Sequence, residues 1–228
     1  MSRTITIGDM FKTIVFDLDG TIADTAPDLA AALNHVLAAM DREQVPLSQV
    51  RSMIGHGARA LLRKGLAATG AVDDALVEAN FPALLRFYED HICDLTRPYP
   101  RVEAAFDALA AAGLNLAICT NKPDRMTRLL IDALGWRDRF TTIVAGDTLA
   151  ASKPDPAPLH LAIERAGGGP AAFVGDSIVD VETARAAGVP CIVVSFGLAD
   201  RPAHELGADA VIDDYSALVT TLTTLSAA

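Results

Sequence analysis

The chain has 228 residues, of which 51% are hydrophobic and 21% are charged, and its formal net charge is −10. This composition is typical of a globular protein with one large domain or two small ones. Lys and Arg form no basic stripe, so nucleic acids and anionic membranes are not expected partners. Because the bulk charge would not attract an anionic substrate, a site for one must be locally cationic.

The three cysteines, Cys93, Cys119 and Cys191, lack the spacing of metal ligands. Two of them stand in apolar runs, which predicts buried, unreactive thiols in a reducing compartment. Residues 1–10 contain no apolar segment of a secretory signal. No stretch approaches the ~18 apolar residues of a membrane span. We therefore expect a cytoplasmic protein, either a monomer or a homodimer.

The first predicted element is a buried strand at residues 14–16, followed directly by acid and glycine at residues 17–21. In open α/β sheets the carboxyl ends of strands face the ligand crevice. Asp17 and Asp19 point the same way from an extended chain. Such like charges need a proton, a metal ion or a lysine beside them. The alternative is a plain strand-to-turn junction, with Asp and Gly present as turn formers.

Residues 23–96 carry helical periodicity and no convincing strand, and Pro98-Tyr99-Pro100 marks where this segment ends. We expect residues 23–96 to be an inserted helical cap domain over a catalytic core formed by residues 1–22 and 97–228. Asp24 and Thr25 would lie at the hinge of the cap in structural roles.

From residue 114 onward, strand-like and helix-like segments alternate. Strands are predicted at 114–120, 142–145, 171–174, 191–194 and 209–212, and helices at 123–134, 156–166, 178–187 and 215–225. This order indicates βαβ units, hence a Rossmann-like, doubly wound parallel sheet.

Three more polar groups follow strand or loop ends: Thr120 with Asn121, Lys153 beside Pro154, and Asp176 with Asp180. Each has a plainer alternative, as a helix cap, a surface lysine or a pair of first-turn acids. Because parallel strands share one carboxyl edge, we expect all of them to meet in one crevice.

These residue types suit phosphoryl transfer. Carboxylate and carbonyl oxygens are the ligands that Mg²⁺ prefers. The ion would offset a repulsion of about 4 kcal/mol per close carboxylate pair. Lys153 and Thr120 offer donors for phosphoryl oxygens. The chain has no Gly-x-x-x-x-Gly-Lys-Ser/Thr loop, which argues against an ordinary nucleotide-dependent kinase.

The motifs, in this order, resemble those of the haloacid dehalogenase superfamily of phosphotransferases over essentially the whole chain. The resemblance implies that Asp17 is the nucleophile, phosphorylated on its carboxylate, and that Asp19 is the general acid and base. Thr120, Asn121 and Lys153 would then hold the phosphate.

The same resemblance implies that Mg²⁺ binds Asp17, Asp176 and the backbone carbonyl of Asp19. Asp180 would support the Mg²⁺ waters or Lys153. The substrate would be a small phosphorylated metabolite.

Within the superfamily, residues 17–29, 54–62 and 120–123 resemble the branch that hydrolyses 2-phosphoglycolate to glycolate and phosphate. The carboxylate of that substrate needs a partner in the cap. Arg59 and Arg63 are one helical turn apart, and His56 stands between glycines that allow close backbone approach. We expect Arg59 to bind the carboxylate, with His56 nearby; the alternative is a solvated helix face.

Three other activities share parts of this pattern. A sugar phosphomutase would use Asp17 and Asp19 identically. A metal-free 2-haloacid dehalogenase is disfavoured because it needs neither Asp19 nor the Asp176 acid pair. A receiver-type signalling domain, the non-enzyme alternative, also combines an aspartate with Mg²⁺, a hydroxyl and a lysine, but it lacks an acid two residues past the phosphorylated one.

Overall fold

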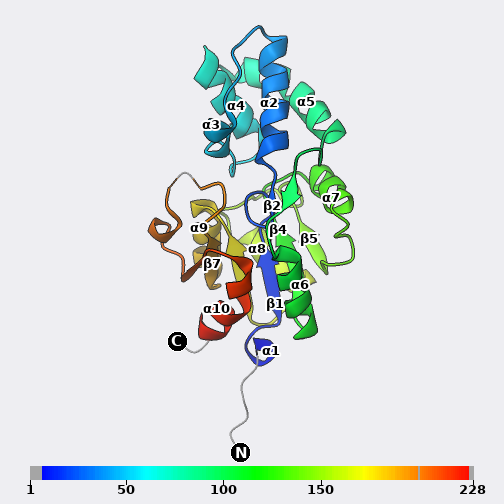
Figure 1. The fold of residues 1–228 in the computed structure, drawn as a ribbon, viewed down its shortest axis with the longest axis vertical. Coiled ribbons are helices and arrows are strands. Elements are labelled where there is room, and N and C mark those ends of the chain that lie inside the picture. Colours follow the sequence, from blue (N-terminus) through cyan, green and yellow to red (C-terminus); the bar gives the residue numbers. More distant parts are fainter. Residues whose placement is uncertain (1–6, 200, 226–228) are drawn as a thin grey trace, which may run out of the picture.

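The computed structural model describes residues 7–199 and 201–225, and its centre is a six-stranded parallel sheet (Figure 1). The strands are β1 (Thr13–Phe16), β4 (Asn115–Cys119), β5 (Thr142–Val144), β6 (Ala171–Gly175), β7 (Cys191–Val194) and β8 (Ala210–Ile212), in the spatial order β5-β4-β1-β6-β7-β8. All five pairings are parallel, which confirms the predicted doubly wound α/β fold. Because the strand order reverses around β1, the crevice of this fold lies at the carboxyl end of β1.

The sheet is covered on both faces, and the side chains of β1 show why. All four of its residues are buried. Ile14 and Phe16 pack into one hydrophobic cluster, and Val15 packs into another on the opposite face, as the two-residue period of a strand requires. The first cluster includes side chains of α6 (Val102–Ala111), α7 (Asp124–Ala133) and α10 (Leu218–Leu225). The second includes side chains of α8 (Ala157–Arg165) and α9 (Ile178–Ala187).

Four helices form a separate layer above the carboxyl edge of the sheet (Figure 1). They are α2 (Ala26–Ala39), α3 (Leu47–Arg51), α4 (Ala58–Thr69) and α5 (Asp74–Asp90), and we refer to them as the helical layer. The layer has its own hydrophobic cluster. Gly65 allows α4 to approach α2 closely, since a Cβ there would lie 2.4 Å from Leu33 Cδ1. The division into cap and core domains at the stated boundaries stays a prediction.

The chain enters and leaves the helical layer side by side. Strand β2 (Ala23–Asp24) pairs antiparallel with β3 (Arg97–Pro98). The buried Asp28 carboxylate accepts hydrogen bonds from Leu95 N, Thr96 N and Thr96 Oγ1 at 2.7–3.1 Å. Asp24 forms an ion pair with Arg51 of α3 at 2.6 Å. The strand pairing and the hydrogen bonds of Asp28 hold the segment that enters the helical layer against the segment that leaves it.

Some elements differ from the sequence-based prediction. The short helix α1 (Ile7–Met10), α6 and the β2–β3 pair were not predicted. The last predicted helix begins as a 3₁₀ turn, η2 (Tyr215–Ala217), because the Asp214 side chain accepts from Ser216 N. A second 3₁₀ turn, η1, spans Ala203–Glu205. Among the described residues, no helix is both long enough and apolar enough to cross a bilayer.

Candidate active site

The candidate site is built from the ends of three neighbouring strands. Asp17 follows β1, Thr120 follows β4, and Asp176 follows β6. The register aligns these ends, because Phe16 pairs with Ile118 on one side and with Val174 on the other. Lys153 comes from the loop before α8. The structure therefore brings these four predicted residues to one edge of the sheet.

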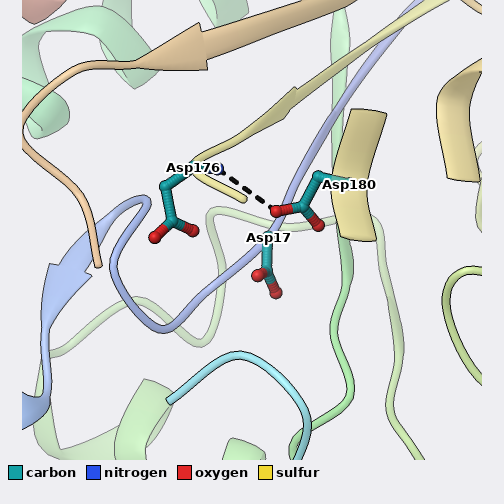
Figure 2. Close-up of side chains that lie close together, drawn as sticks. All are labelled: Asp17, Asp176 and Asp180. Atoms are coloured by element: carbon teal, nitrogen blue, oxygen red, sulfur yellow. Dashed lines mark hydrogen bonds between the residues drawn. The ribbon is translucent and has the colours of Figure 1, made fainter. Parts of the chain in front are cut away.

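Three carboxylates meet at this edge. Ligand oxygens of Asp17, Asp176 and Asp180 all lie within 4.8 Å of one another, and all three residues are buried (Figure 2). Lys153 Nζ lies 3.0 Å from Asp17 Oδ1 and 2.6 Å from Asp180 Oδ1. Burial opposes the charge on Lys153, but Asp17 and Asp180 outweigh it and raise the pKa of the ammonium. One buried cation thus faces three buried acids.

The pKa values of two of these acids, Asp17 and Asp176, are raised. Burial raises the pKa of Asp17 to about 6; Lys153 opposes the rise, and Asp180 and Asp19 add to it. Burial, followed by Asp180 and Asp17, raises the pKa of Asp176 well above its ordinary value. Asp17 Oδ1 is a buried atom that accepts no hydrogen bond among the described residues, although the Lys153 ammonium lies beside it. An all-oxygen donor set with a surplus of negative charge fits a hard divalent cation such as Mg²⁺.

Asp176 and Asp180 are held by their surroundings. Asp176 accepts from Thr21 Oγ1 at 2.9 Å and from Leu198 N at 2.7 Å. Gly197 leaves the space for Asp176, since a Cβ there would lie 2.3 Å from the Asp176 Cβ. Asp180 Oδ2 accepts from the backbone N and the hydroxyl of Ser177, while its Oδ1 accepts from Lys153. Asp180 is therefore both a helix-capping acid and the partner of Lys153.

Asn121 lies on the wall of a cavity beside Thr120 and is bonded to the lysine loop. Its side-chain amide donates to Lys153 O at 3.0 Å and accepts from Lys153 N at 2.9 Å. Gly146 packs against the same residue, since a Cβ there would lie 2.3 Å from Asn121 O. Both side-chain groups of Asn121 thus position the lysine loop. A direct contact of Asn121 with phosphate stays a prediction.

Asp19 lies beside a cation that sequence reasoning missed. Lys122 is buried and donates to Asp19 Oδ1 at 2.9 Å, to Asp19 Oδ2 at 3.2 Å and to Tyr88 OH at 2.6 Å. Burial lowers the pKa of Lys122, but Asp19 and Tyr88 reverse the effect and raise it above its ordinary value. Lys122 directly follows Thr120-Asn121, which was a signal for its place. Tyr88 is a buried residue of α5. The apolar pattern of that helix does not indicate that Tyr88 reaches the site.

A small cavity of about 50 Å³ lies between the helical layer and the sheet edge. The sheet edge contributes its polar wall, formed by Asp17, Asp19, Thr120, Asn121 and Lys122. The helical layer contributes mainly apolar side chains and glycine, together with Tyr88. The cavity therefore combines reactive groups from the sheet with an apolar cover.

Arg59, Arg63 and His56 are exposed and do not line this cavity. Arg59 donates to both carboxylate oxygens of Glu78 at 3.0 and 3.1 Å and lies over the Phe81 ring. Arg63 forms an ion pair with Asp74. Helix α4 turns Leu61 inward, which directs both arginines outward. The structure does not bring these predicted residues to the core residues, and their role toward substrate stays a prediction.

Comparisons with known proteins show the family of the chain. The model of the haloacid dehalogenase-like hydrolase family matches residues 14–194. A phosphoglycolate phosphatase of Rhodospirillum rubrum is 41% identical over 92% of this chain and 90% of its own length. That of Mesorhizobium japonicum is 43% identical over 92% of this chain and 93% of its own. A crystal structure from Haemophilus somnus, described as a predicted phosphoglycolate phosphatase, has a TM-score of 0.87 at 29% identity and covers 93% of this chain and 98% of its own.

Proposed function

Because the chain belongs to the haloacid dehalogenase-like hydrolase family and is a phosphoric monoester hydrolase, we propose that its substrate is 2-phosphoglycolate, released as glycolate and phosphate. The observation that carries the chemistry is the pairing of buried Asp17 with Lys153 at the carboxyl end of β1. The substrate follows from the relatives that bear this activity in their names and match over most of their length. Membership of this hydrolase family argues against a non-enzymatic, receiver-type signalling domain.

The reaction proceeds in two transfers through Asp17. Its carboxylate oxygen attacks phosphorus, and the bond from phosphorus to the ester oxygen breaks while Asp19 gives that oxygen a proton. Asp19 then takes a proton from water, the water oxygen attacks phosphorus, and the Asp17 carboxylate leaves. Lys153 and Thr120 donate to the phosphoryl oxygens, where charge is spread in the transition state.

A metal site completes the proposal. Asp17, Asp176 and the backbone carbonyl of Asp19 would hold Mg²⁺, with Asp180 supporting the arrangement through Lys153. When bound, the cation offsets the charge of the carboxylates and of the phosphoryl group. The raised pKa values of Asp17 and Asp176 support this assignment, because burial, together with the neighbouring carboxylates, disfavours their charged forms and a bound cation would offset that cost.

The test is phosphate release from a panel of small phosphate esters, with MgCl₂ or with excess EDTA. The expected result is highest kcat/KM on 2-phosphoglycolate and no turnover in EDTA. Asp17→Asn is the control for contaminating phosphatases. Turnover that depends on a catalytic sugar bisphosphate would instead identify a mutase. Turnover unchanged in EDTA would contradict the proposed dependence on Mg²⁺.

A further inference from the structure

The carboxylate of the proposed substrate needs a counter-charge, and the cavity wall contains one candidate. Lys122 is the single cation among the described residues that line the cavity. Arg59 and Arg63 point outward and are paired with Glu78 and Asp74. The remaining cover from the helical layer is apolar apart from Tyr88. A second anion on the substrate would otherwise meet a wall that cannot stabilise it.

The partners of Lys122 differ in kind. Its ammonium has three N–H donors, which bond to both oxygens of Asp19 and to Tyr88 OH. The Lys122 side chain is 3% exposed and that of Asp19 is 16% exposed. Tyr88 is a fixed neutral partner from α5, whereas Asp19 is a carboxylate that the proposed reaction needs at the ester oxygen. The ion pair with Lys122 engages both carboxylate oxygens of Asp19.

We propose that Lys122 is the residue that selects the substrate carboxylate, and that the carboxylate takes the place of Asp19 on the ammonium. Tyr88 keeps the ammonium in position during the exchange. Asp19, released from Lys122, takes up a proton from solvent and turns to the ester oxygen. Recognition of the carboxylate and placement of the acid are then one event. This inference rests on the proposed function.

The exchange favours one spacing of charges. Asp19 must contact the ester oxygen, and Lys122 Nζ lies 2.9 Å from Asp19 Oδ1. An anion that meets Lys122 therefore lies close to the ester oxygen, as does a carboxylate on the carbon that bears the ester. An ester of similar size without that carboxylate would leave Asp19 on Lys122. The preference should thus be lost when the lysine charge is lost.

The test compares three substrates in the full-length enzyme with Mg²⁺: 2-phosphoglycolate, ethyl phosphate and p-nitrophenyl phosphate. Ethyl phosphate has an alkyl leaving group without a carboxylate, and p-nitrophenol leaves without protonation. In Lys122→Met, kcat/KM for 2-phosphoglycolate should fall by about 100-fold, as expected when one partner of a buried charge pair is truncated. The values for the other two esters should change by less than about 5-fold in either direction, which also shows that the variant is folded.

Equal losses on all three substrates would overturn the proposal and assign Lys122 to folding. Equal losses on both alkyl esters, with p-nitrophenyl phosphate spared, would also overturn the proposal, because Lys122 would then act only through Asp19 and not on the carboxylate. If wild-type enzyme fails to hydrolyse 2-phosphoglycolate, the proposed function itself is wrong. Should Lys122→Met not fold, Tyr88→Phe decides: a loss of about 5-fold confined to 2-phosphoglycolate supports the proposal, and a uniform loss overturns it.

Discussion

The sheet edge and the helical layer contribute opposite kinds of surface to one cavity. At the sheet edge Asp17, Lys153 and Asp176 are buried, and each lies within contact distance of other polar groups. The helical layer directs Arg59 and Arg63 to solvent and turns apolar side chains inward. Burying charge costs free energy unless partners compensate it, and the strand ends supply those partners. The sheet therefore supplies the charged groups of the cavity, and the helical layer supplies a mainly apolar cover.

The largest expected effect is at the centre of the sheet edge. Asp17→Asn should lower kcat by at least about 1000-fold, since it replaces the attacking carboxylate by a neutral, poorly nucleophilic amide. Circular dichroism should show an unchanged fold. Phosphate release and acyl-phosphate labelling with ³²P would measure the effect. Residual turnover within 10-fold of wild type, with no label on wild-type protein, would remove Asp17 as the nucleophile.

The sheet edge and the helical layer each contain an asparagine whose side-chain amide bonds both backbone groups of a distant residue. Asn121 bonds both backbone groups of Lys153, and Asn34 does the same to Val45 within the helical layer. Replacing either by Ala should cost about 1–3 kcal/mol of unfolding free energy. Asn121→Ala should also lower kcat by about 30-fold because the lysine loop loses its anchor, whereas Asn34→Ala should change kcat by less than about 2-fold. A similar kcat in both variants would contradict the positioning role of Asn121.

The stability of the metal-free protein should depend on pH through Asp17. The pKa of this carboxyl is about 6 in the folded protein against 3.8 for an ordinary one. Between these values the folded state holds a proton that the unfolded state has lost, so stability falls as pH rises from about 4 to 6. The full loss is on the order of 3 kcal/mol.

Urea unfolding in EDTA at pH 4.5 and pH 7 would measure that loss. Asp17→Asn should flatten the slope and leave a remainder from Asp176, whose pKa is also raised. Added MgCl₂ should stabilise wild type most at pH 7. A wild-type protein that is more stable at pH 7 than at pH 4.5 without metal would contradict the buried-charge account.

The smallest effect is expected on the outer face of the helical layer. Arg59→Ala removes an exposed ion pair with Glu78, so unfolding free energy should change by less than about 1 kcal/mol. The KM for 2-phosphoglycolate should change by less than about 3-fold, and Glu78→Gln serves as the matched control. A large rise in that KM, absent for p-nitrophenyl phosphate, would show that Arg59 binds the substrate carboxylate, as the sequence pattern predicts.

The core of the site could be predicted from sequence because strand ends are local features. An apolar run followed by Asp17, Thr120 or Asp176 identifies the residue, and a parallel sheet brings the ends together. The bond between Lys122 and Tyr88 could not be predicted, because it depends on how α5 packs against the loop after β4. The spacing of Arg59 and Arg63 placed them on one helix face without saying which face is buried. Strands of two residues, such as β2 and β3, have no period to detect.

The shared anchor at Asp28 has a consequence for how such a molecule can change. Since Ala23 pairs with Pro98, the segment that contains the four helices begins and ends at neighbouring positions. The sheet does not depend on the length of chain between those two residues. Loops whose ends are close tolerate long insertions at little entropic cost. A scaffold with this topology can exchange its cover for one of another size and so take a new ester, while the phosphorus chemistry beneath stays the same.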